Sequence, residues 1–310
     1  MNLFEHDTVA TFPAGCLDGS STVLAVVGID VPAGRHGVIV AGTPFHPLDH
    51  RWPDQPADTG IIELLGHRLP VLDCVVGAAP RGTADVLVGS AIPARRGDDA
   101  WCWLVVHVVE LDPSLATWAV GASVRLTVDG KRRWDLSGAH TACHLSGFAI
   151  NAALAGYWRK PVAADALGTP DFERQALVAS SLSELRYHDT YRIGRSLRKA
   201  GFDTDGLPSV VPSLGVTLEK RMCDWTATAA PVRVTAAGPG LGSIRTWTCD
   251  LPSGTVRVPC GGTHLTDLAG LAGVRVEVSL SAAGDVLDVV GTVELHPVGA
   301  SARADARVSR

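Results

Sequence analysis

Two short strings of the sequence each place two metal-capable side chains four positions apart. The first holds His140 and His144, and the second, far downstream, holds Cys260 and His264. On a helix, positions i and i+4 share a face with their Cβ atoms roughly 5–6 Å apart, so the histidine pair could grip one ion. Two glycines between Cys260 and His264 predict a turn that brings thiol and imidazole to one point. Three imidazoles and one thiolate form a borderline-soft donor set that favours tetrahedral zinc.

Two other interpretations of these residues are weaker. The metalloprotease helix, His-Glu-x-x-His, needs a glutamate as general base, and Thr141 occupies that position. Alternatively, His140 and His144 are core histidines and Cys260 is a buried small hydrophobe. Either pair alone would be a weak signal, but two such pairs, each inside a recognisable string, favour a shared metal.

These strings resemble the editing domain of alanyl-tRNA synthetase and the free-standing AlaX proteins built from it. Residues 132–145 read Arg-Arg-Trp-Asp-Leu-Ser-Gly-Ala-His-Thr-Ala-Cys-His-Leu, and residues 259–265 read Pro-Cys-Gly-Gly-Thr-His-Leu. Residues 55–60, Gln-Pro-Ala-Asp-Thr-Gly, are similar to the family's Gly-Gly-Gly-Gln-Pro-x-Asp-x-Gly motif. The motifs follow the family's order over roughly residues 20 to 295, and no aminoacylation motif accompanies them. The chain therefore resembles a stand-alone, trans-acting member.

The resemblance implies a trans-editing deacylase that hydrolyses the ester between a wrong amino acid and a tRNA. It implies zinc ligands at His140, His144, Cys260 and His264. Gln55 matches the family glutamine implicated in editing, and Thr263 is placed near the metal by its neighbours. The mischarged aminoacyl-tRNA is the expected partner, with neither DNA nor a membrane expected. Its amino acid would be serine or glycine on the alanine tRNA, or threonine or a threonine analogue such as fluorothreonine.

The sequence also departs from the family. Trp52, Pro53 and Asp54 replace the three glycines before Gln55, and residues 157–214 do not match the AlaX pattern. Asp58 could simply be a turn-forming residue, and Gln55 could be a surface turn residue. Substrate identity could have diverged in these segments.

The role of the zinc is open at the level of sequence. Four protein ligands normally describe a structural zinc, whereas catalytic zinc keeps an open position. We expect the metal to orient the substrate, with a structural zinc as the alternative. Two other functions remain: a zinc-dependent hydrolase of a small free ester or amide, and a non-catalytic tRNA- or amino-acid-binding module with structural zinc.

Composition describes an ordinary globular chain of 310 residues, 46% hydrophobic and 19% charged. No run of 18 apolar residues is present and the N-terminus carries Glu5 and Asp7, so neither a membrane span nor a secretory signal is expected. Seven irregularly spaced cysteines indicate reduced thiols and a cytoplasmic location. The net charge is −5, but residues 131–221 hold 13 Lys and Arg against 9 Asp and Glu. A phosphate backbone needs only such a local patch.

The expected fold is α+β, with an N-terminal β-barrel-like domain followed by an α+β zinc-binding editing domain with an antiparallel sheet. The predicted boundaries are 1–130, 131–298 and a flexible tail at 299–310. The first domain would hold short strands at 22–29, 37–41, 60–65, 69–76, 85–88, 101–109 and 123–128. The second would hold helices over 131–155 and 171–200, a short helical segment from 266, and strands at 232–236, 243–249, 255–258, 274–280 and 286–295.

Overall fold

The chain has a mixed α+β fold, and the computed structural model describes residues 3–28 and 35–297. Within these ranges the first of two compact units contains 3–133, 234–246 and 259–263, and the second contains 134–233, 247–258 and 264–297. The expected tail at 299–310 lies outside the described residues, as does the end of the strand expected over 22–29. No described helix combines the length and the apolar character needed to cross a membrane.

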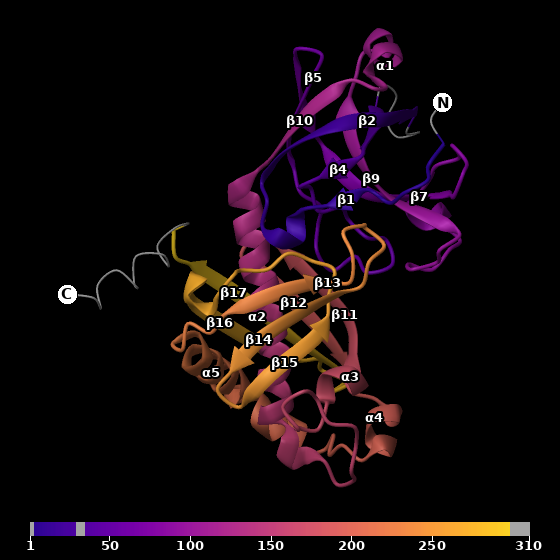
Figure 1. Ribbon diagram of the computed structural model, residues 1–310. Coiled ribbons are helices and arrows are strands. Elements are labelled where there is room, and N and C mark those ends of the chain that lie inside the picture. The colour runs from indigo at the N-terminus through magenta and orange to yellow at the C-terminus, as the bar shows by residue number, and fades with distance from the viewer. Residues whose placement is uncertain (1–2, 29–34, 298–310) are drawn as a thin grey trace, which may run out of the picture. The chain divides into compact units, whose positions relative to one another are not determined.

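An antiparallel sheet of eight strands dominates the first unit (Figure 1). In sheet order the strands are β6 (His67–Val71), β5 (Gly60–Leu64), β10 (Ser123–Val128), β2 (Asp18–Gly28), β3 (Arg35–Val40), β9 (Trp101–Glu110), β7 (Asp73–Pro80) and β8 (Leu87–Val88). Only Leu72 separates β6 from β7, so one bent strand contributes to both halves of this order and the sheet is curled. These strands confirm the β-structure predicted for the first 130 residues.

Shorter elements complete the first unit. They are β1 (Val9–Ala10) paired in parallel with β4 (Gly42–Thr43), the 3-10 turns η1 (Phe12–Ala14) and η2 (Gly89–Ala91), and α1 (Pro113–Ala119). The side chain of Asp112 caps α1 by accepting from the Ser114 N–H at 2.8 Å.

Strand β9 is the core of the first unit because both of its faces are buried. Successive side chains of a strand point to opposite faces. Trp103 and Val105 belong to the larger apolar cluster, and Leu104 and Val106 to a second cluster. An unbroken apolar run, rather than alternation, is the sequence signature of this placement.

Helix α2 (Gly130–Ala153) confirms the helix predicted over 131–155 and carries the first histidine pair. Asp129 caps it by accepting from the N–H groups of Lys131 and Arg132 at 3.0 and 3.1 Å. Within the second unit the helix approaches a sheet closely at Gly138, where a Cβ would stand 2.6 Å from the side chain of Leu295. Only glycine allows this approach without displacing that leucine.

The sheet that α2 covers has four antiparallel strands in the order β11 (Leu177–Ser183), β12 (Arg186–Arg192), β17 (Val286–Leu295) and β16 (Leu271–Leu280). The strands predicted at 274–280 and 286–295 are confirmed.

The prediction of one helix over 171–200 is wrong. The segment contains α3 (Phe172–Ala176), β11, β12 and α4 (Arg195–Ala200). Tyr187, Asp189 and Tyr191 are buried at alternate positions, which is the period of a strand, and Leu185 adopts φ 60° in the tight turn between the two strands. The acidic residues at the start of this segment and the basic residues at its end are typical of the two ends of one helix. They belong, however, to different elements: Asp171 caps α3, whereas Arg198 and Lys199 end α4.

Helix α5 (Leu207–Thr226) was not predicted. It contains Pro212 and buries a stripe at helical spacing that comprises Leu207, Leu214, Leu218, Met222 and Trp225. The helix packs against β16, and a Cβ at Gly215 would stand 2.4 Å from the carbonyl oxygen of Val276.

A separate three-stranded sheet contains β13 (Val232–Ala236), β14 (Arg245–Leu251) and β15 (Gly254–Pro259), in agreement with the strands predicted at 232–236, 243–249 and 255–258. Two 3-10 turns, η3 (Ala155–Tyr157) and η4 (Leu268–Gly270), lie in the second unit, and η4 corresponds to the short helical segment expected from 266.

Candidate metal centre

His140 and His144 lie on one face of α2, as their spacing predicts. Their rings are stacked, with centroids 4.9 Å apart and planes 25° apart. His264 lies far downstream in the sequence but packs against both rings. Its ring centroid is 4.2 Å from that of His140 and 5.1 Å from that of His144. Three imidazoles from two distant stretches therefore form one cluster.

Thr141 fixes the third histidine against the helix. Its hydroxyl donates to the carbonyl oxygen of Ser137 at 2.8 Å and accepts the N–H of Leu265 at 3.1 Å. The same hydroxyl is 3.4 Å from Nδ1 of His264. The residue that occupies the place of a metalloprotease glutamate thus ties α2 to the segment that carries His264.

Cys260 completes a group that could hold a metal ion. One ligand atom from each of His140, His144, Cys260 and His264 lies within 4.8 Å of the others. This is the constellation that the sequence predicted.

The chemistry of the donors fits a cation. Nε2 of His144 is buried and has no hydrogen-bond partner among the described residues, and burial lowers the pKa of this imidazole to about 4. His144 is therefore neutral at physiological pH, with a buried nitrogen available to a ligand. Burial raises the pKa of the Cys260 thiol to about 12, against a backbone hydrogen bond from Gly262 that lowers it. A metal would displace that thiol proton on binding.

The turn before His264 does not need the left-handed backbone that glycine favours. Neither Gly261 nor Gly262 is among the described residues with positive φ, and a Cβ at Gly261 would meet no atom within 4 Å. This turn instead contributes the backbone N–H of Gly262, which donates a hydrogen bond to the Cys260 sulfur.

Trp247 is a wall of the cluster that the sequence did not reveal. Its ring centroid is 4.8 Å from that of His144 and 5.8 Å from that of His264, and its side chain is fully buried. The alternating burial of β14, on which it lies, indicates only an inward-facing residue. Proximity to the histidines depends on the packing of distant segments.

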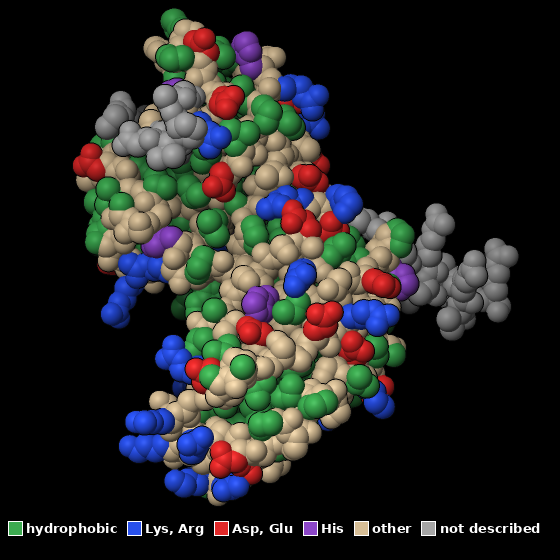
Figure 2. All heavy atoms as spheres, turned by 180° about the vertical axis from the view of Figure 1, so that it is seen from behind, with side chains coloured by type: hydrophobic (Ala, Val, Ile, Leu, Met, Phe, Trp, Pro, Cys, Tyr) green, Lys and Arg blue, Asp and Glu red, His purple; other side chains and the backbone are tan. Residues whose placement is uncertain are grey.

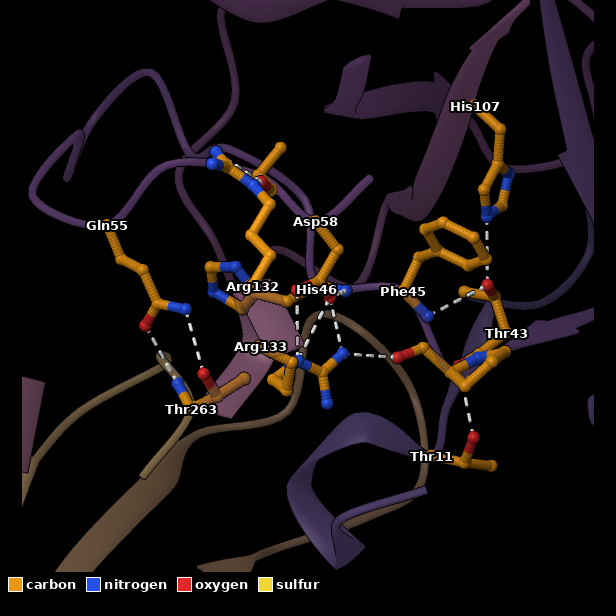
Figure 3. Close-up of polar contacts among 12 residues, drawn as sticks. Thr11, Thr43, Phe45, His46, Gln55, Asp58, His107, Arg132, Arg133 and Thr263 are labelled. Carbon is orange, nitrogen blue, oxygen red and sulfur yellow. Dashed lines mark hydrogen bonds and ion pairs between the residues drawn. The ribbon is translucent and has the colours of Figure 1, made fainter. Parts of the chain in front are cut away.

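Gln55 and Thr263 form a doubly hydrogen-bonded pair within the first unit (Figure 3). Nε2 of Gln55 donates to the Thr263 hydroxyl at 2.8 Å, and the Thr263 N–H donates to Oε1 of Gln55 at 2.9 Å. Both residues are buried, so the alternative that Gln55 is a surface turn residue is wrong. The glutamine holds the residue next to His264 in a fixed position.

Asp54, one of the residues that replace the family's glycines, has a titratable side chain close to the centre of this loop's hydrogen bonds. Its carboxylate accepts the indole N–H of Trp52 at 2.9 Å and the Gln55 N–H at 2.8 Å. Burial raises its pKa to about 6, and its charge in turn raises the pKa of Cys260. A carboxyl group that titrates near neutral pH beside the Gln55–Thr263 pair is a candidate acid or base.

Asp58 is not a turn-forming residue but the centre of a buried ion pair (Figure 3). Nε of Arg133 donates to it at 2.9 Å, and Nη2 of Arg133 also donates to the carbonyl oxygen of Pro44 at 2.7 Å. Asp58 further accepts the N–H of His46, whose imidazole has a pKa lowered to about 4, mainly by burial. This network fixes the loop after Gln55.

A second titratable cluster borders α2 at Cys143 and Gly147, inside the second unit. The Cys143 thiol is 3.5 Å from a carboxylate oxygen of Asp189 and 3.7 Å from the Ser180 hydroxyl. Glu173 lies against Gly147, where a Cβ would stand 2.0 Å from its carboxylate. Burial raises the pKa of Glu173 to about 8 and that of Asp189 to about 6, and the Asp189 charge adds to the shift of Glu173.

Comparisons with known proteins add little. No protein-family model and no curated protein matches the chain. Among solved structures, the di-domain ARO/CYC StfQ from the steffimycin biosynthetic pathway is 14% identical, over 96% of this chain and 85% of that chain, at a TM-score of 0.13. A likeness at this score carries no argument about fold or chemistry.

Proposed function

We propose that this chain is a metal-dependent, trans-editing aminoacyl-tRNA deacylase of the AlaX type, with zinc as its metal. The observation that carries the proposal is the convergence of His140, His144, Cys260 and His264 into one group of potential ligands. Under this proposal the curled sheet of the first unit is the β-barrel-like domain, and the second unit supplies the editing domain.

The substrate chemistry suits such a centre. An aminoacyl ester is already activated, so the protein needs mainly to position it and to stabilise charge in a tetrahedral intermediate. Bound zinc would supply a Lewis acid that orients or polarises the ester. Thr141 and the Gln55–Thr263 pair would hold the ligand-bearing segments rigid, because each makes more than one hydrogen bond there.

The substrate class follows from the resemblance and remains part of the proposal. The ester would carry a small or β-hydroxy amino acid: serine or glycine on the alanine tRNA, or threonine or an analogue such as fluorothreonine. A buried site that hydrogen-bonds a substrate hydroxyl discriminates strongly, whereas one methyl group is worth about 1–3 kcal/mol.

The decisive experiment assays Cys260→Ala/His264→Ala against a panel of charged tRNAs, with metal content measured on the same samples. We expect the bound metal to be lost and deacylation to fall by roughly a hundredfold or more, since even outer partners of metal ligands change activity by about 10–100-fold. The matched control is Cys223→Ala/His67→Ala, which replaces the same residue types at exposed positions and should change neither readout.

Three outcomes separate the proposal from its rivals. Hydrolysis of small free esters with no preference for a tRNA carrier would replace it with a zinc-dependent esterase or amidase. Loss of metal with undiminished deacylation would leave the metal a structural role. Tight tRNA binding without hydrolysis of any charged tRNA would indicate a binding module.

A further inference from the structure

A cavity of about 380 Å³ lies in the second unit, beyond the C-terminal end of α2. Residues between 155 and 170 line it, with Trp158, Arg159 and Lys160 among them. Pockets of about 300 Å³ and more accommodate small ligands. The space is therefore sufficient for one nucleotide and insufficient for a duplex.

Trp158 gives this cavity an aromatic wall. Its ring packs edge-on against Phe202, with centroids 5.2 Å apart, and a backbone bridge joins the same two residues. The indole Nε1 is buried without a hydrogen-bond partner among the described residues. A ligand in the cavity therefore meets the indole ring, on which a base can stack.

Lys160 and Arg159 supply positive charge at the same cavity. The Lys160 stem lies against Gly201, where φ is 111° and a Cβ would stand 2.7 Å from the Cβ of Lys160. Nζ of Lys160 donates to the carbonyl oxygen of Lys199 at 3.4 Å, and Nη2 of Arg159 pairs with Asp203 at 2.7 Å. Both basic side chains are exposed, so they can also contact a ligand.

Several basic side chains lie close to the cavity. Figure 2 shows Lys and Arg side chains gathered at the lower left of the view, the end of the second unit at which Figure 1 places α4. Asp203 and Asp205 pair with Arg159 and Arg198. Across the described part of the chain, no carboxylate lies within ion-pair distance of Lys160, Lys199 or Arg195, so their charges are not offset.

We propose that this cavity binds single-stranded RNA, taking one of the nucleotides that precede the aminoacylated end. Lys160 and Arg159 contact phosphates, and a base packs on the Trp158 ring. The inference rests on the proposed function. His144 and Ala153 are nine residues apart on α2, about 14 Å at 1.5 Å per residue, so a few nucleotides connect the cavity with the histidines.

The test measures binding of a fluorescent, uncharged oligoribonucleotide ending in CCA as salt is varied. Each phosphate contact in single-stranded nucleic acid contributes about −0.7 to the slope of log K against log salt. Arg159→Gln/Lys160→Gln should weaken binding at least tenfold at low salt and reduce the slope by about 1.4. The charge-matched control, Lys220→Gln/Arg233→Gln, alters exposed residues of the same unit and should leave affinity and slope unchanged.

Trp158→Leu isolates the aromatic ring, because leucine keeps an apolar contact with Phe202. This substitution should weaken binding of the oligonucleotide several-fold without changing the slope of log K against log salt. Wild-type affinity and slope in the Arg159/Lys160 variant would overturn the inference. So would a free mononucleotide binding as tightly as the oligonucleotide, which would make the cavity a nucleotide site.

Failure of this inference is distinguishable from failure of the proposed function. The Arg159/Lys160 variant should hydrolyse a small aminoacyl ester at the wild-type rate while losing activity on charged tRNA. If it deacylates charged tRNA at the wild-type rate, the cavity assignment is wrong and the proposed function stands. If the wild type hydrolyses no charged tRNA but the variant still loses RNA binding, the cavity assignment stands and the proposed function is wrong.

Discussion

At the scale of single residues, the candidate centre depends on side chains that hold the donors as much as on the donors themselves. Thr141 connects α2 with the His264 segment, and Gln55 holds Thr263 through two hydrogen bonds. Asp54 differs from these because its pKa of about 6 lets it change charge near neutral pH. A group with such a pKa is suited to move a proton during ester hydrolysis.

If Asp54 is the general base of the proposed deacylation, Asp54→Asn should lower the rate by roughly 10²–10⁴-fold. In the wild type, activity should rise with pH through about 6 as the carboxyl loses its proton, and this limb should vanish in the variant. The pH–rate profile measures both. Asp98→Asn, an exposed change in the same unit, is the control. A variant that keeps the wild-type profile would leave Asp54 a structural residue.

The donors could be predicted from the sequence because each pair is local: residues four apart meet on one helix or around one short turn. Convergence of the two pairs was inferred from resemblance, and the structure brings the four residues together. Trp247 and the bonds of Thr141 could not be predicted, since they depend on segments far apart in sequence. The unusual environment of Asp54 depends on burial, which its own loop sequence does not reveal.

At the scale of elements, prediction succeeded where the apolar period was clear and failed where charges suggested a helix. Helix α2 and most strands of the eight-stranded sheet were predicted to within a few residues, although β6 and β7 were expected as one strand and β1 and β4 were not predicted. The helix expected over 171–200 is a hairpin flanked by short helices. Tyr187 and Tyr191 are buried on one face of β12, and β12 pairs with β17, which lies far away in the sequence. Helix α5 was not predicted, because Pro212 lies inside it and proline is unfavourable in the interior of a helix. Packing of its buried apolar side chains nevertheless stabilises the helix.

Gly291 tests the packing of that hairpin on β17. It lies opposite Tyr187, and a Cβ there would stand 1.9 Å from the buried tyrosine ring. Gly291→Ala should therefore reduce the free energy of unfolding by about 1–3 kcal/mol or more, as overpacked cores do. Chemical denaturation measures this. Gly156→Ala, where a Cβ would meet no atom within 4 Å, should change little, and equal effects of the two substitutions would contradict the packing described.

At the scale of the whole molecule, buried acids make stability depend on pH. Glu173 has an ordinary pKa of 4.5 when unfolded and about 8 in the folded protein. Between these values the folded state holds a proton that the unfolded state has lost. The free energy of unfolding should thus fall as pH rises from 4.5 to about 8 and level off above it.

Glu173→Gln should flatten this dependence, because a neutral side chain takes up no proton on folding. Urea denaturation at several pH values through the window between 4.5 and about 8 measures the slope. Asp189 should leave a smaller residual slope below pH 6, where its own raised pKa lies. Glu277→Gln, an exposed change on β16, should retain the wild-type slope, and an unchanged slope in Glu173→Gln would show that the glutamate ionises normally.

The bend at Leu72 has a consequence for the behaviour of the protein in a crowded solution. Open sheet margins expose unpaired N–H and C=O groups that recruit other chains and lead to aggregation. Here one continuous segment serves as β6 and β7, and the outermost strand beyond β7 is β8, only two residues long. A margin so short offers little template for another chain. We therefore expect the β8 margin of the curled sheet to recruit other chains poorly.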